Sequence, residues 1–92
     1  MIRIGLIDSG INIDNPLIVN KGYIINGWTA FGGNFNDTLG HGTRCVNLIL
    51  KDTESLFEIY NVKVFDKTLR TSTKNILDAL QWCIQSDSFY HM

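Results

Sequence analysis

Ile4-Gly5-Leu6-Ile7-Asp8-Ser9-Gly10 is the stretch of this chain that decides the fold. It continues an aliphatic run that begins at Ile2, and a carboxylate followed by a glycine ends it. A short, almost unbroken apolar run is typical of a strand that is buried on both faces, as in a parallel sheet. The sequence therefore predicts a buried strand from Ile2 to Ile7, with Asp8 at its carboxyl end.

The rest of the chain alternates between strand and helix patterns. Extended segments are predicted at 23–25 and 28–31, interrupted at Asn26-Gly27, and at 56–65. Helices are predicted at 43–50 and from about Lys74 to Gln85, the second capped by Ser72 or Thr73. Loops are predicted at 12–16, 32–37 and 66–71, and a polar link at 51–55. The residues expected to face inward are Val46, Leu48, Ile49 and Leu50 in the first helix, and Ile76, Leu77, Leu80, Cys83 and Ile84 in the second.

This alternation predicts an α/β fold with a mostly parallel sheet. The 92 residues form one small domain, 1–92, without internal repeats. In such sheets, functional sites lie beyond the carboxyl ends of the strands. Asp8 is placed at such an end, so topology alone makes it a candidate site residue.

Composition excludes several classes of protein. With 45% hydrophobic residues and one proline the chain is globular, and a net charge of −1 without a basic stripe argues against nucleic acid as a partner. The cationic residues Lys63, Lys67, Arg70 and Lys74 are interpreted as a solvated loop and helix start. No apolar run approaches the ~20 residues of a membrane span. Met1-Ile2-Arg3 leads directly into the first strand, without a signal peptide, so the chain as written is expected to be cytoplasmic.

Gly40-His41-Gly42-Thr43 is the second informative stretch, placed just before the first helix. A hydroxyl nucleophile needs a base within hydrogen-bond reach, and imidazole titrates near neutral pH. A buried aspartate holds the imidazole in the required tautomer and stabilises the imidazolium. We therefore assign Asp8 as the orienting acid and His41 as the general base and acid, 33 positions apart.

The neighbours of this pair are assigned supporting roles. Gly40 and Gly42, on either side of His41, would let the backbone pass close to Asp8 and to a substrate, and Gly10, which ends the first strand, is a further supporting residue. Thr43 is expected to cap the helix that presents His41. Ser9 is expected to be a hydrogen-bond partner at the strand end.

Two cysteines allow other interpretations. In a chain without a secretion signal, Cys45 and Cys83 are expected to be buried free thiols, with a disulfide as the alternative. His41 and Cys45 lie four residues apart on one helix face, with Asp8 expected nearby, which is a weak metal-ligand pattern without a second His/Cys cluster. We predict no metal, and a structural rather than nucleophilic thiol at Cys45.

Taken together, these motifs resemble the N-terminal part of a subtilisin-like serine peptidase, over almost the whole chain. The matching pieces occur in the family's order and spacing: Ile7-Asp8-Ser9-Gly10-Ile11, Asn15-Pro16-Leu17, His41-Gly42-Thr43-Arg44-Cys45, Tyr60-Asn61-Val62-Lys63-Val64-Phe65, and the helix from Ile76 to Ile84 with Trp82. The resemblance implies a partial three-layer subtilisin-like fold and peptide-bond hydrolysis, with a peptide or protein as substrate.

The resemblance also shows what the sequence does not contain. The family's nucleophile motif, Gly-Thr-Ser-x-Ala, and its oxyanion asparagine would follow Met92, and Ser9, Ser55, Ser72, Ser86 and Ser88 have no such context. Leu17 stands where relatives carry an acidic residue, so the calcium that the family suggests is not supported here. Asn47 replaces a residue that is usually small, so helix packing there is expected to differ.

Three hypotheses remain open at this point. The chain is the Asp/His-bearing part of a peptidase that needs a companion to supply serine and oxyanion groups, a non-catalytic peptide-binding module, or a truncated product without function. In each case an open sheet edge is expected, covered by a companion, by a second copy of the chain or by another protein.

Overall fold

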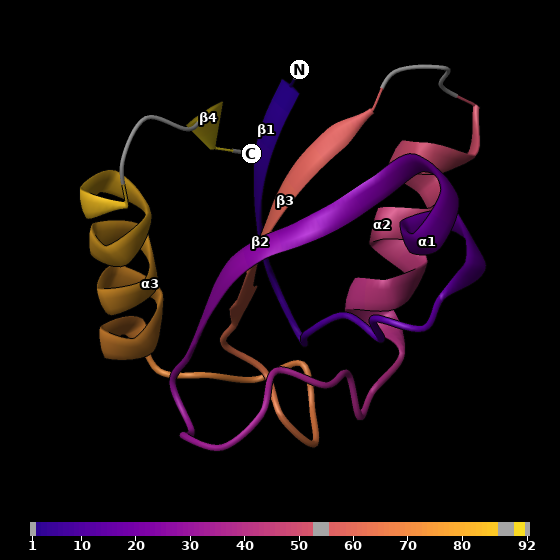
Figure 1. Cartoon of the computed structure of the whole chain (residues 1–92). Helices are drawn as coiled ribbons and strands as arrows, with labels where there is room; N and C mark the ends of the chain where they lie inside the picture. The colour runs from indigo at the N-terminus through magenta and orange to yellow at the C-terminus, as the bar shows by residue number, and fades with distance from the viewer. Residues whose placement is uncertain (1, 53–55, 87–89, 92) are drawn as a thin grey trace.

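A parallel sheet lies at the centre of the molecule (Figure 1). The structure is a computed structural model that describes residues 2–52, 56–86 and 90–91. Within that part of the chain the strands are β1 (Ile2–Asp8), β2 (Gly22–Thr29), β3 (Phe57–Lys63) and β4 (Tyr90–His91), in the spatial order β2-β3-β1-β4. The pairs β1–β3, β1–β4 and β2–β3 are all parallel, as the sequence predicts.

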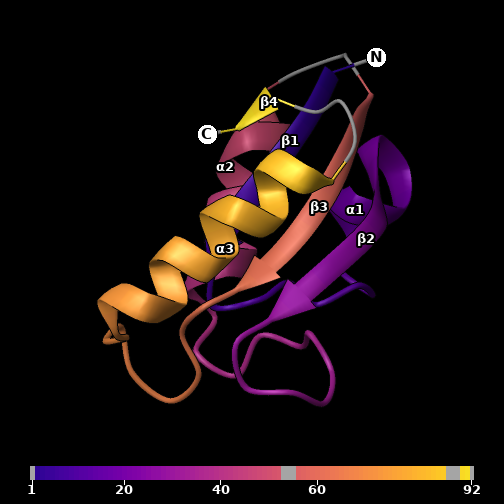
Figure 2. The ribbon, with the colours of Figure 1, turned by 90° about the vertical axis from the view of Figure 1, so that its left-hand side faces the viewer.

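The helices cover both faces of this sheet, which gives three layers (Figures 1 and 2). On one face lie α1 (Pro16–Lys21) and α2 (His41–Lys51), and on the other lies α3 (Thr73–Gln85). Each face has its own core cluster, one with Val46 and Leu50 from α2 and the other with Ala79 and Cys83 from α3. The predicted α/β, three-layer architecture is confirmed.

The alternation of side chains along β1 determines where Asp8 points. Ile4 and Leu6 belong to the cluster beneath α2, whereas Ile7 packs with the cluster beneath α3. Because successive residues of a strand face opposite sides, Asp8 shares the face of Ile4 and Leu6. Its carboxylate therefore points toward α2, where the predicted histidine motif begins.

Helix α1 was not predicted, because Asn15-Pro16 was interpreted as part of a loop. Proline is compatible with the first helical position, where its missing N–H is not needed. The side chain of Asn15 caps the helix, its Oδ1 accepting from the Leu17 N–H at 3.3 Å. The same dipeptide thus starts a short helix here.

The predicted inward faces of the helices are only partly correct. In α2, Val46 and Leu50 are buried but Leu48 is 71% exposed. In α3, Cys83 is buried but Leu77 and Ile84 are exposed to 59% and 73%. The face of α3 that meets the sheet contains Ala79, whose small side chain allows close approach, together with Ile76 and Trp82. Helical spacing of the large apolar residues assigned this stripe only partly correctly, and an apolar outer face of α3 remains, formed by Leu77, Leu80 and Ile84.

Other local predictions have mixed outcomes. Ser72 caps α3, its hydroxyl oxygen accepting from the Asn75 N–H at 3.0 Å. The predicted interruption at Asn26-Gly27 is absent, because β2 runs continuously through these residues. Its pairing with β3 instead shifts register between Ile24 and Asn26. The solvated interpretation of Lys63 is wrong, because this side chain is buried and its Nζ donates to the Asn36 carbonyl at 2.6 Å.

At the end of the sequence, Phe89, Tyr90 and Met92 predict the lead-in to a further strand. Tyr90 lies in β4, while Phe89 and Met92, which belong to the same prediction, fall outside the described residues. In the described ranges no helix combines the length and hydropathy of a membrane span.

Candidate active site

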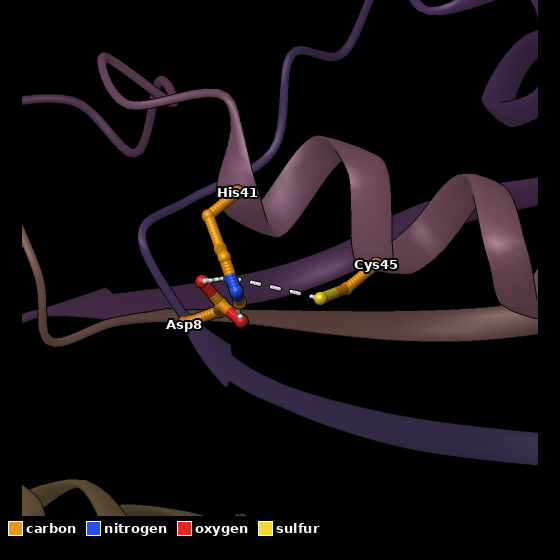
Figure 3. Close-up of side chains that lie close together, drawn as sticks. All are labelled: Asp8, His41 and Cys45. Atoms are coloured by element: carbon orange, nitrogen blue, oxygen red, sulfur yellow. Dashed lines mark hydrogen bonds and ion pairs between the residues drawn. The ribbon is translucent and has the colours of Figure 1, made fainter. Parts of the chain in front are cut away.

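Asp8 and His41 are brought together at the carboxyl end of β1 and the first residue of α2 (Figure 3). His41 Nδ1 lies 2.9 Å from Asp8 Oδ1 and 3.0 Å from Asp8 Oδ2. The Asp8 side chain is 11% exposed and that of His41 is 40% exposed. The arrangement is a buried acid paired with an imidazole that remains accessible to solvent.

This geometry determines which ring nitrogen carries the proton. A carboxylate can only accept hydrogen bonds, so His41 Nδ1 must donate to Asp8. In the neutral ring Nε2 is then the unprotonated nitrogen, free to accept a proton from a nucleophile. The pair thus has the tautomer that a general base requires, and Asp8 would stabilise the imidazolium formed after proton transfer.

Ser9 joins the strand end to the helix start. Its N–H donates to Asp8 Oδ1 at 2.7 Å, its hydroxyl donates to Asp37 Oδ1 at 2.7 Å, and its oxygen accepts from the Gly42 N–H at 2.9 Å. Ser9 is fully buried. The Ser9 hydroxyl thus both donates and accepts a hydrogen bond within the site. Ser9 therefore has the structural role that the sequence predicts, and its hydroxyl is not positioned to act as a nucleophile.

Gly10 and Gly42 are needed for close backbone contact, whereas a Cβ on Gly40 would meet only the end of the Arg44 side chain, at 3.1 Å. A Cβ on Gly42 would lie 2.1 Å from the Gly10 carbonyl oxygen, and one on Gly10 would lie 2.5 Å from the Phe35 carbonyl oxygen. Gly10 and Gly40 also have positive φ, at 104° and 87°. Any larger residue at position 42 would push the start of α2 away from the end of β1.

Asp37, which the sequence did not single out, caps α2. The predicted cap at Thr43 is wrong: Gly40 is the N-cap residue, without a side-chain cap of its own. Asp37 Oδ1 accepts from the Gly40 N–H at 2.7 Å and Asp37 Oδ2 from the Thr43 N–H at 2.9 Å. The Thr43 hydroxyl oxygen instead accepts from the Asn12 N–H at 3.1 Å, which ties the loop after β1 to the helix.

A signal for Asp37 exists in the sequence but is weak. A carboxylate just before a helix interacts favourably with the partial positive charge of the helix N-terminus. Asp37 precedes His41 by four residues, but it lies in a polar loop beside Asn34 and Asn36, which share its turn-forming character. Only the folded chain distinguishes the three.

The charge on Asp37 predicts a pH dependence of stability. Burial alone would raise the pKa of Asp37, but hydrogen bonds from Thr43, Ser9 and Gly40 outweigh it and lower the pKa. A carboxyl whose pKa is lower in the folded state contributes stability above its unfolded value, about 3.9, and loses it as the pH falls through the folded value. The urea midpoint should therefore fall more steeply between pH 6 and pH 3 for the native chain than for Asp37→Asn. Equal slopes would contradict this role.

Cys45 lies beside the pair on the Nδ1 side of the imidazole. Its Sγ is 3.7 Å from His41 Nδ1, and its side chain packs against the core cluster beneath α2. Burial, and then the negative charge of Asp8, raise the pKa of the Cys45 thiol. A protonated thiol facing the nitrogen that donates to Asp8 is poorly placed to be a nucleophile, as expected from the sequence.

The same three side chains could approach one metal ion. One ligand atom each from Asp8, His41 and Cys45 lies within 4.8 Å of the others. An ion there would occupy His41 Nδ1, the nitrogen that binds Asp8, so metal binding and the Asp8–His41 hydrogen bond are mutually exclusive. Leu17, at the position considered for calcium, packs against the core and offers no oxygen ligand from its side chain.

The cysteines are free and lie apart. Cys45 packs with the cluster beneath α2, and Cys83 belongs to the cluster beneath α3, on the opposite face of the sheet. Burial raises the pKa of the Cys83 thiol. Both thiols are unpaired, as the sequence predicts, but only Cys83 is buried, and Cys45 is half-buried.

Within the described residues, no serine hydroxyl is hydrogen-bonded to His41. Ser9 is committed to Asp37 and Gly42, Ser72 caps α3, and Ser86 lies at the other end of that helix. Ser55 and Ser88 fall outside the described residues. The described part therefore holds an acid and a base without an adjacent hydroxyl nucleophile.

Known proteins are similar to this chain in sequence and in fold. The chain is 40% identical over 81 residues to alkaline protease 1 of Aspergillus clavatus, and 29% identical over 92 residues to a subtilisin-like protease of Coccidioides posadasii. A crystal structure of a lanthipeptide protease superimposes with a TM-score of 0.69 at 26% identity and covers 94% of this chain. This chain resembles a part of the subtilisin-like serine peptidases. No family model matches it.

The match covers only a small part of these subtilisin-like relatives, so their whole activity cannot be assigned to this chain. The two fungal proteins are matched over 84% and 91% of this chain but over only 19% and 22% of their own length. The chain likewise covers 26% of the lanthipeptide protease chain. It spans about a fifth of the curated relatives, so it is a protease-related part, and the activity of a whole peptidase is a proposal.

Proposed function

We propose that this chain supplies the acid and the base of a subtilisin-like serine endopeptidase, with Asp8 and His41 in those roles. The observation that carries the proposal is the contact between His41 Nδ1 and the buried Asp8 carboxylate at 2.9 Å and 3.0 Å. A histidine held this way has its Nε2 free to activate a hydroxyl, and a chain that only binds peptides has no need of the pair.

The proposed reaction is peptide-bond hydrolysis by acyl transfer. His41 Nε2 takes the proton of a serine hydroxyl as that oxygen attacks the peptide carbonyl carbon, and then gives the proton to the leaving amine. Water attacks the resulting ester by the same route, and the serine is regenerated. Asp8 stays ionised throughout and stabilises the imidazolium. The substrate is a peptide or protein, and the chain alone is inactive because it supplies no nucleophile.

The serine and the oxyanion donors would come from a companion part, on another polypeptide or elsewhere on a longer one. Two surfaces support this proposal. On the side of β4, β1 pairs only through Ile4 and Gly5 within the described residues, so its carboxyl-terminal half has no described neighbour there. The outer face of α3 exposes Leu77 and Ile84. Both this edge of β1 and the apolar face of α3 would be covered by a companion that extends the sheet.

Purification from the natural source, followed by a fluorophosphonate serine probe and native mass spectrometry, tests this proposal. We expect a serine-bearing companion part to co-purify with the 92 residues and to carry the label. Heat-denatured material serves as the control and should remain unlabelled, because the probe reports an activated serine. If no serine in the complex reacts, the catalytic proposal fails. A bound peptide that stays intact would then favour the non-catalytic binding module.

A further inference from the structure

We propose that Asp37 is a positioning residue that fixes His41 relative to Asp8. The inference rests on the proposed catalytic role of that pair and adds a second carboxylate to the machinery, one that touches neither reacting atoms nor substrate. It is drawn from the hydrogen bonds that converge on Asp37 from three segments of the chain.

The first segment is the start of α2, where Asp37 holds the backbone on both sides of His41. Its carboxylate accepts from the Gly40 N–H at 2.7 Å and from the Thr43 N–H at 2.9 Å. It also accepts from the Leu39 N–H at 3.0 Å. Because these donors bracket His41 in sequence, the direction in which the imidazole leaves the helix depends on where the Asp37 oxygens lie.

The second segment is the end of β1, which Asp37 reaches through Ser9. The Ser9 hydroxyl has one proton, and it is donated to Asp37 Oδ1 at 2.7 Å. The hydroxyl oxygen is thereby turned toward the Gly42 N–H, from which it accepts at 2.9 Å. Since the Ser9 N–H binds Asp8 Oδ1 at 2.7 Å, one residue connects Asp37, the acid and the helix that carries the base.

The third segment is the loop after β1, where the Asp37 N–H donates to Asn12 Oδ1 at 3.2 Å. Asn12 in turn donates its own N–H to the Thr43 hydroxyl oxygen at 3.1 Å. Strand end, loop and helix start are thus joined around one buried residue, Asp37, which is 8% exposed and contacts the loop through its backbone and the other two segments through its side chain.

This arrangement requires a carboxylate and not an amide. Donors approach both oxygens of Asp37, and a carboxylate accepts with both. In Asp37→Asn one oxygen becomes an NH₂ group, which would face either the Thr43 N–H or the Ser9 and Gly40 donors. A buried donor would lose its partner and the helix start would move. A movement of about 1 Å at a catalytic group is enough to cost about 100-fold in rate.

The test measures the geometry of the pair directly, by the ¹H NMR resonance of the His41 Nδ1 proton. Hydrogen bonding to Asp8 moves this resonance downfield and slows its exchange with water. The sample is the 92-residue chain together with any polypeptide that co-purifies with it. In Asp37→Asn we expect the resonance to be lost or to move upfield, while the backbone amide spectrum remains that of a folded chain.

Asp78→Asn is the matched control. It makes the same chemical change at an acid on α3, whose carboxylate accepts a hydrogen bond from Lys74 Nζ at 2.7 Å. Helix α3 lies on the opposite face of the sheet from α2, which carries His41 (Figure 1). We expect Asp78→Asn to keep the downfield resonance. An equal loss in both variants would show a general effect of stability and would overturn the positioning role.

Retention of the resonance in a folded Asp37→Asn chain would also overturn the inference. If Asp37→Asn does not fold, Ser9→Ala decides, because it removes the link to Asp37 and keeps the Ser9 N–H on Asp8. Loss or weakening of the resonance in Ser9→Ala supports the inference, and an unchanged resonance contradicts it. Because the readout is a hydrogen bond and not hydrolysis, failure of the proposed peptidase function would be seen separately, as an unreactive serine.

Discussion

Turnover by the assembled peptidase is expected to fall about 10⁴-fold or more when either Asp8 or His41 is replaced by alanine, the magnitude known for such triads in general. Without His41 no base accepts the serine proton. Without Asp8 the imidazole loses the partner that holds Nδ1–H at 2.9 Å and 3.0 Å, and with it the correct tautomer. Peptide hydrolysis by the complex of this chain with the proposed serine-bearing companion measures the loss.

The control for this prediction separates chemistry from assembly. Native mass spectrometry should show that Asp8→Ala and His41→Ala still bind the companion, because neither side chain belongs to the outer face of α3 and a strand paired with the β1 edge would contact backbone groups, which both variants keep. Asp78→Asn, on α3, should retain turnover. Native-level hydrolysis by either alanine variant would remove that residue from the proposed triad.

Gly42→Ala is expected to give the largest loss of stability among the site glycines. The added Cβ would lie 2.1 Å from the Gly10 carbonyl oxygen, a backbone atom that cannot rotate away. Overpacking of this kind costs about 2–3 kcal/mol, which lowers the melting temperature of a domain of this size by about 10–20 °C. Thermal unfolding followed by circular dichroism measures the change.

Gly33→Ala provides the comparison for Gly42→Ala. Gly33 has a positive φ of 73° but no atom within 4 Å of an added Cβ, so only backbone strain opposes the substitution. Its cost should be about 1 kcal/mol. A melting temperature for Gly42→Ala that is no lower than that of Gly33→Ala would contradict the close contact between the start of α2 and Gly10.

The strands and the Asp8–His41 pair could be predicted because their signals are local. The apolar run of β1 and the abrupt change at Asp8 require no knowledge of the rest of the chain. Pairing with His41 followed from the chemistry of a triad and from the family resemblance. The structure supplies what these signals lack, namely that the alternation of β1 turns Asp8 toward α2.

The role of Asp37 and the buried face of α3 could not be predicted, because they depend on contacts between segments that are distant in sequence. Asp37 looks like any polar loop residue until Ser9, Gly40 and Thr43 converge on it. Leu77 is predicted to be buried because apolar residues recur there at helical spacing, yet it is exposed, and the small Ala79 faces the sheet. Sequence periodicity indicates that a helix has apolar faces, but it does not show which face packs against the sheet and which remains exposed.

The rate at which a fluorophosphonate labels the companion serine tests the central claim most directly, measured with this chain in its native form and as His41→Ala. The reaction needs an activated serine but no peptide substrate, so it isolates the role of the base. If this chain supplies that base, the native complex is labelled rapidly and the His41→Ala complex, equally well assembled, is not. Equal labelling rates in the two complexes would show that the serine is activated without His41 and would contradict the account.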